Sequence, residues 1–138
     1  MKIAFSTILN LKFPVLAAVA FALLHAQGFA DELRESYVAR LSARDHFSSR
    51  GERLHSAAEV IRQDRANYYV YNIRDDEDEP DTFFANKANR ARLEQLLEHG
   101  RSEGSAVRRV MNGTPLIKVM IYRDDAGRDY ITVTVISD

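Results

Sequence analysis

The sequence contains no cysteine among its 138 residues. This absence excludes disulfide bonds and the cysteine-containing zinc sites that stabilise many small domains. It also excludes the lipid-bearing cysteine of a lipoprotein. A small domain without these devices must be held together by packing alone.

The sequence also lacks an apolar run long enough to span a membrane. Its longest run, residues 13–24, has 12 residues. As a helix it would measure about 18 Å, whereas the hydrocarbon core of a bilayer is about 30 Å thick. We therefore expect no transmembrane anchor in the mature protein.

The beginning of the chain has the organisation of a cleavable secretory signal peptide. Lys2 and Lys12 precede the apolar run, and the small residues Gly28 and Ala30 lie three and one positions before Asp31. A basic segment, an apolar segment and a small-residue cleavage site occur in this order in signal peptides. The pattern predicts cleavage after Ala30 and a periplasmic or secreted protein.

A basic excess is missing as well. The predicted signal peptide, residues 1–30, holds two of the 19 basic residues and none of the 20 acidic ones, so residues 31–138 carry 17 against 20. Nucleic-acid binding requires basic residues gathered on one face, whereas here arginines are scattered among carboxylates. We expect no nucleic-acid partner, and the remaining 108 residues suffice for a single small domain.

Two segments have the periodicity of amphipathic helices. Ser49 and Glu52 form a capping-box pattern, which predicts a helix over about residues 51–65. A second helix is predicted over about residues 86–99, because Gly100 is a common residue after a helix end. The apolar positions of the two helices are Leu54, Ala57, Ala58, Ile61, Leu93, Leu96 and Leu97.

Between these helices, residues 67–73 alternate β-favouring side chains, which predicts a strand. Residues 75–81 contain six carboxylates and Pro80. Mutual repulsion predicts a solvated, irregular loop there. Phe83 and Phe84 do not fit the following leucine pattern, and we expect them to fill the core from the loop side.

The C-terminal third predicts three antiparallel strands in meander order: residues 107–111, 114–122 and 130–137, with an Asn112-Gly113 turn between the first two. Residues 31–43 fit either a helix or a strand, and their length favours a short strand. The residues predicted to face inward are Ile117, Val119, Ile121, Ile131, Val133 and Val135.

The predicted fold is α+β, with two helices packed on one face of a small antiparallel sheet that ends in the three-stranded meander. The order helix, strand, helix, strand, strand is similar, in topology alone, to that of small envelope domains of the BON type, which are associated with membranes.

A literal G-x-S-x-G pattern occurs at Gly100, Ser102 and Gly104. In serine hydrolases the serine stands on a sharp turn after a strand and before a helix. Here a helix is predicted before the serine and a strand after it. The pattern therefore indicates a polar linker rather than a nucleophile.

Three histidines, His46, His55 and His99, follow the signal peptide. None belongs to an H-E-x-x-H pattern, and no cysteine can complete a structural zinc site. Surface or helix-capping roles are the predicted ones.

Asp76, Asp78 and Asp81 supply carboxylates of the kind that bind calcium. An EF-hand loop that begins at Asp76 would need glycine at its sixth position and glutamate at its twelfth, where the sequence has Asp81 and Lys87. We predict no metal site and no cofactor, and whether this loop binds a cation is left open.

Tyr68, Tyr69 and Tyr71, with two tyrosines of the predicted hairpin, form either an aromatic interface or part of ordinary sheet packing. The predicted partner-binding residues lie on the outer face of the hairpin: Lys118, Tyr122, Tyr130, Thr132 and Thr134.

No set of acid, base and electrophile converges on one predicted element. The sequence therefore favours an exported, non-enzymatic envelope protein, a binding or accessory module for a protein or glycan partner. Two alternatives stay open: a small secreted hydrolase or metal-dependent enzyme that uses Ser102 or the carboxylates, and a secreted effector or inhibitor. The oligomeric state is not predicted.

Overall fold

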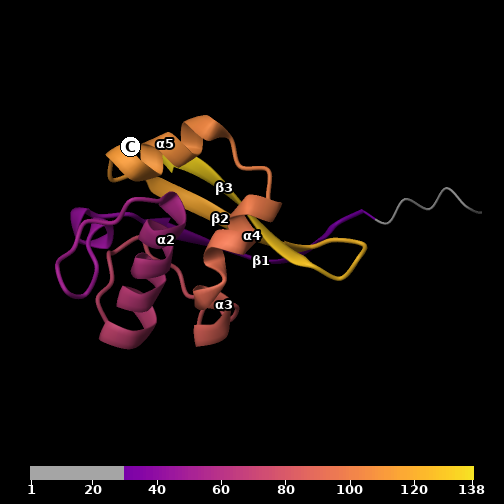
Figure 1. Ribbon diagram of the computed structural model, residues 1–138, viewed down its shortest axis with the longest axis horizontal. Helices are drawn as coiled ribbons and strands as arrows, with labels where there is room; N and C mark the ends of the chain where they lie inside the picture. The colour runs from indigo at the N-terminus through magenta and orange to yellow at the C-terminus, as the bar shows by residue number, and fades with distance from the viewer. Residues whose placement is uncertain (1–29) are drawn as a thin grey trace, which may run out of the picture.

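The computed structural model describes residues 30–138, so the predicted signal peptide lies outside the described residues apart from Ala30. The described residues form four helices and a three-stranded antiparallel sheet of strand order β1-β2-β3 (Figure 1). The elements in chain order are β1 (Glu32–Arg40), the 3-10 turn η2 (Ala43–His46), α2 (Ala57–Ala66), the π-helical turn η3 (Asn67–Tyr71), α3 (Lys87–Ala91), α4 (Leu93–His99), α5 (Gly104–Asn112), β2 (Leu116–Arg123) and β3 (Asp129–Ser137). The predicted α+β class is confirmed.

The sheet combines the C-terminal hairpin with a strand from the start of the domain. β2 and β3 form the predicted hairpin, whereas the third strand is β1, which pairs antiparallel with β2. Residues 31–43 therefore contain a strand, as their length suggested. Alternate β1 residues, Tyr37 and Ala39, are fully buried, which is the period-2 pattern of a half-buried strand.

One face of the sheet forms the core and lies under the helices. The predicted inward register of the hairpin is confirmed: five of the six residues are buried, and Val135 is partly buried against them. Burial of one such side chain contributes about 1.5 to 3 kcal/mol. The buried apolar residues that the helices and the loop before α3 supply are Ala57, Ala58, Val60, Ile61, Phe84, Leu93, Leu96 and Val110.

Residues 107–111 were predicted as a strand, and this prediction is wrong. They belong to α5, in which Ala106 and Val110 are buried four positions apart, the spacing of one helix face. Asn112-Gly113 ends this helix instead of forming a hairpin turn, because the Gly113 N–H donates to the Arg109 carbonyl at 3.0 Å.

The predicted strand over residues 67–73 is also wrong. Residues 67–71 prolong α2 as the π-helical turn η3, and the next residue, Asn72, takes the left-handed conformation with φ 54°. The Asn67 side chain donates to Asp45 Oδ1 at 2.8 Å, and the consecutive Tyr68 and Tyr69 both find interior partners. The chain therefore lacks the strand between helices on which the similarity to BON domains rested.

The two predicted helices begin and end differently from their expected bounds. α2 starts at Ala57 because Ser56 and Glu59, rather than Ser49 and Glu52, form the capping box. The helix expected over residues 86–99 is divided into α3 and α4 by Arg92, whose φ and ψ of −102° and 19° leave the helical range.

The acidic loop is irregular and largely exposed, as predicted, and it also covers the outer edge of β1. The Glu79 N–H donates to the Val38 carbonyl at 2.9 Å, as a neighbouring strand would, and the Glu79 carboxylate accepts from the Val38 N–H at 2.9 Å. Asp78 Oδ1 accepts from the Arg40 N–H at 2.9 Å. Exposed strand edges favour aggregation, and carboxylates occupy this one.

The opposite edge, on β3, is covered by the linker between α4 and α5. Ser102 Oγ accepts from the Val133 N–H at 2.9 Å. Gly100 lies directly against the β3 backbone, and a Cβ atom added to it would come within 1.6 Å of the Ile131 carbonyl oxygen. Only glycine allows the linker to approach this closely.

Among residues 30–138, no helix has both the length and the apolarity that crossing a bilayer requires.

The close approach predicts that substitution by alanine changes stability differently at Gly100, in the linker, and at Gly104, the first residue of α5. Gly100→Ala should lower the free energy of unfolding by at least about 2 kcal/mol, because a methyl group would displace the β3 backbone. At Gly104 the added Cβ meets only the flexible end of the Arg108 side chain, at 3.6 Å. Gly104→Ala should be neutral or stabilise α5 by up to about 1 kcal/mol. Urea unfolding of both variants checks this, and equal midpoints would contradict the proposed packing.

Candidate functional site

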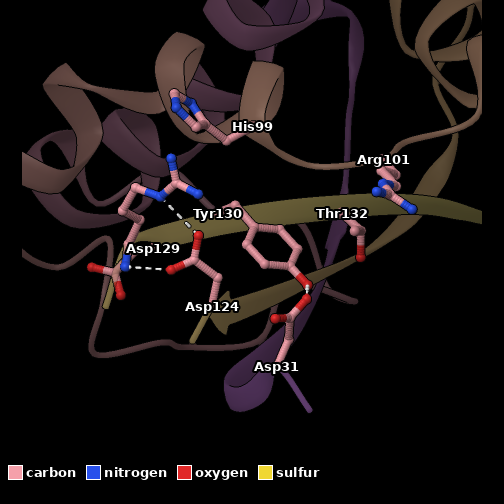
Figure 2. A pocket seen from close by; sticks show the side chains of 8 residues that line it. Asp31, His99, Arg101, Asp124, Asp129, Tyr130 and Thr132 are labelled. Carbon is pink, nitrogen blue, oxygen red and sulfur yellow. Dashed lines mark hydrogen bonds and ion pairs between the residues drawn. The ribbon is translucent and has the colours of Figure 1, made fainter. Parts of the chain in front are cut away.

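A hollow of about 450 Å³ lies at one end of the sheet, where the β2–β3 turn, the start of β1 and the end of α4 meet (Figure 2). We call it the rim hollow. Every side chain that lines it carries a hydrogen-bonding group. The lining residues are Asp31, His99, Arg101, Asp124, Arg128, Asp129, Tyr130 and Thr132.

An aromatic ring forms the floor of the rim hollow. Tyr122 and Tyr130 are direct cross-strand partners, and their rings stack with centroids 5.2 Å apart and planes 16° from parallel. Such pairs are favourable beyond the area they bury. Figure 2 shows the Tyr130 ring in the middle of the hollow, between His99 and Asp31.

The floor is tied to the beginning of β1. The Tyr130 hydroxyl donates to Asp31 Oδ2 at 2.6 Å. The hydrogen bond to the Asp31 carboxylate raises the pKa of Tyr130 to about 12. Tyr130 is therefore a neutral hydrogen-bond donor throughout the physiological pH range.

Two carboxylates of the hollow are neutralised by arginines. Arg128 Nε contacts Asp124 Oδ2 at 2.8 Å, and the two side chains close the β2–β3 turn. Asp129 contacts Arg123 at 2.9 Å and Arg92 at 3.1 Å. These ion pairs hold the two carboxylates in place. Because each carboxylate is already paired with a guanidinium group, neither is free to accept a proton from a ligand or to bind a metal ion.

Two other groups of the hollow keep unused hydrogen-bonding capacity. Arg101 is exposed and makes no ion pair within residues 30–138. The Thr132 hydroxyl is buried in the wall and has no hydrogen-bond partner in the described part of the chain. Buried polar atoms are normally paired, so this atom indicates an incomplete polar surface.

No family model, curated protein or solved structure matches this chain. The chemistry of the site is therefore argued from its own residues.

The five predicted partner-binding residues all lie on the sheet face away from the helices. Tyr130 and Thr132 line the rim hollow, and Tyr122 stacks beneath Tyr130. Lys118 and Thr134 are exposed cross-strand partners farther along the same face.

Sequence reasoning missed Asp31 and Arg101. Both are single polar residues in segments without a motif. They reach Tyr130 only because β1 pairs with β2 and because Gly100 brings its linker onto β3. No local sequence signal identifies them.

Ser102 is placed as part of the scaffold. The helix α5 follows it, where a strand was expected, and its hydroxyl accepts from the β3 backbone. Ser102 does not line the rim hollow, and its glycine neighbour at position 100 serves close packing.

The three histidines have separate surroundings. His55 is exposed, and the His99 Nδ1 lies 2.7 Å from the Gln95 carbonyl in the last turn of α4. His46 is buried, so a surface role is wrong for this residue, whereas its contacts with helix-end carbonyls agree with the predicted capping role. Its two ring nitrogens lie 3.2 Å and 2.8 Å from the carbonyls of Ser42 and Val110, which connects η2 to α5.

The acidic residues considered for calcium are used within the protein. Asp78 accepts from the backbone of Arg40 and Asp75, and the buried Asp81 accepts from the Phe84 N–H at 2.5 Å. Across the described residues, no group of three or more histidine or acidic side chains is placed to hold a metal ion.

The largest group of buried ionisable side chains surrounds Arg65. Its guanidinium is fully buried between the rings of Tyr37 and Tyr68, at 4.3 Å and 4.7 Å from their centroids. It contacts Asp64 at 2.8 Å and Asp81 at 3.2 Å. None of these residues lines the rim hollow, so we assign the group to folding.

Two buried carboxyls, those of Asp64 and Asp45, have raised pKa values. Burial raises the pKa of Asp64 to about 7, although Arg65 favours its charged form. Burial also raises the pKa of Asp45. In the unfolded chain an aspartate ionises near its ordinary pKa of about 4. Folding therefore takes up protons between about pH 4 and pH 7, and the free energy of unfolding falls as the pH rises through this interval.

Asp64→Asn should flatten this pH dependence. From pH 4 to pH 7 the wild type should lose at least about 1.4 kcal/mol more stability than the variant, which corresponds to one pKa unit. Urea unfolding at several pH values measures the difference. Asp76→Asn, at an exposed position, is the control and should follow the wild type. Parallel curves for the wild type and Asp64→Asn would contradict the prediction.

Proposed function

We propose that the chain is exported and that its mature domain is a non-enzymatic binding protein, whose rim hollow binds a glycan of the cell envelope. The observation that carries this proposal is the stacked Tyr122–Tyr130 pair at the floor of a hollow with polar walls.

The two kinds of surface in the hollow suit the two kinds of surface on a sugar. A sugar ring has a face of C–H groups, which packs on the electron-rich face of an aromatic ring such as Tyr130. Its hydroxyl groups donate to carboxylates and accept from guanidinium groups, as Asp31 and Arg101 provide. A volume of about 450 Å³ falls within the range of small-molecule sites.

Binding is better supported than catalysis. General acid–base chemistry needs a titratable group free to exchange a proton with the substrate. Asp124 and Asp129 are held in ion pairs, and Ser102 accepts a backbone hydrogen bond. Asp31 accepts from the Tyr130 hydroxyl, and the His99 Nδ1 lies against the Gln95 carbonyl, with no hydrogen bond from His99 to a carboxylate in the described part of the chain.

The export part of the proposal predicts a defined mature end. N-terminal sequencing of the protein recovered from the periplasm or the medium should begin at Asp31, because Gly28 and Ala30 form the cleavage pattern. Intact Met1 on a soluble cytoplasmic pool would contradict export.

The binding part predicts that Tyr130 is required. Tyr130→Ala should weaken binding of the cell-wall disaccharide of N-acetylglucosamine and N-acetylmuramic acid by about tenfold or more, equivalent to about 1.4 kcal/mol. The control is Tyr71→Ala, because Tyr71 is 49% exposed and does not line the hollow. Titrations followed by NMR measure both affinities. Absence of binding by the wild type, or equal losses in the two variants, would refute the proposal.

A further inference from the structure

We propose that signal-peptide cleavage completes the rim hollow by creating the α-ammonium group of Asp31, and that the completed hollow selects glycans carrying a carboxylate. This inference rests on the proposed export and glycan binding.

The position of Asp31 is the first step. Asp31 directly precedes β1, lines the hollow, and is held there by the Tyr130 hydroxyl at 2.6 Å. Covalent geometry keeps the backbone nitrogen of an aspartate within about 4 Å of its own carboxylate. Figure 2 shows the Asp31 side chain at the wall of the hollow. A chain that begins at Asp31 therefore places its terminal nitrogen close to that wall.

The charge balance of the hollow is the second step. Asp124 and Asp129 are already paired with arginines, so Asp31 and Arg101 are the remaining opposite charges. Before cleavage the nitrogen of Asp31 belongs to a neutral amide. After cleavage it is an amine, which is mostly protonated at neutral pH because its ordinary pKa is about 8. Two positive groups then face one carboxylate.

The ligand class follows from this change. A guanidinium binds a carboxylate through two parallel hydrogen bonds, and Arg101 is exposed without an ion pair in the described chain. The new ammonium adds a second positive charge on the Asp31 side of Tyr130. A sugar that stacks on Tyr130 and carries a carboxylate can therefore contact both, whereas a neutral sugar with the same ring contacts only the floor and the hydroxyl-binding groups.

The test compares N-acetylmuramic acid with N-acetylglucosamine, its neutral counterpart, as probes. Protein processed after Ala30 should bind the acid about fivefold more tightly, the range expected of one exposed charge contact. Acetylation of its α-amino group restores an amide at that nitrogen, and this form should lose the preference. Binding of N-acetylglucosamine should change by less than about twofold, because its contacts are uncharged.

Arg101→Gln should also abolish the preference, whereas Arg108→Gln, at an exposed arginine outside the hollow, should leave it intact. A preference that survives acetylation would overturn this inference and leave glycan binding standing. Failure of both sugars to bind would overturn the proposed function itself, so the two failures are distinguishable.

Discussion

The fold depends on the buried Arg65 guanidinium. It is the point at which α2, β1 and the acidic loop meet, since Arg65 stacks on Tyr37 and binds Asp81 and the Glu79 carbonyl. A charge buried at this depth is tolerated only when it is paired and hydrogen-bonded. In a chain without disulfides, this cluster provides the connection between the helical layer and the loop on the sheet edge. Removing Arg65 would leave the buried carboxyls of Asp64 and Asp81 without their cation.

The same loop covers one edge of the sheet. The rim hollow is built on the ends of the strands, so it depends indirectly on the contacts that hold both edges. Residues 78 and 79 supply to β1 the hydrogen bonds that another strand would supply. At the other edge, Gly100 and Ser102 hold the linker against β3. The hollow lies where the ends of these strands project past the helices, so its residues are positioned by a sheet whose edges are both occupied.

Much of the fold could be predicted from local patterns, and the failures have a common physical cause. The hairpin register follows from the strict alternation of apolar and polar residues along β2 and along β3, because only one face of the sheet is buried. Residues 67–71 and 107–111 contain β-favouring side chains but form helical turns, because Tyr68 packs on Arg65 and Val110 reaches the core at helical spacing. Tertiary partners override propensity in such short segments.

The candidate site was predictable only in part. Tyr130 and Thr132 could be placed on the outer face because their alternation in β3 is clear. Asp31 and Arg101 could not, since their proximity to Tyr130 arises from contacts between distant segments. Likewise, the six carboxylates of residues 75–81 suggested mutual repulsion. The β1 backbone N–H groups and Arg65 bind three of them, and no local sequence pattern indicates these contacts.

The pairing of β1 with β2 has a consequence for the order of events during synthesis. The partner strand of β1 begins only at Leu116, close to the end of the chain, and contacts between distant residues form late because loop closure is costly. Until that last segment emerges, β1 has no strand to join, and the acidic loop has no completed sheet to cover. The sheet can therefore close only after β2 has been made, more than 70 residues after the end of β1.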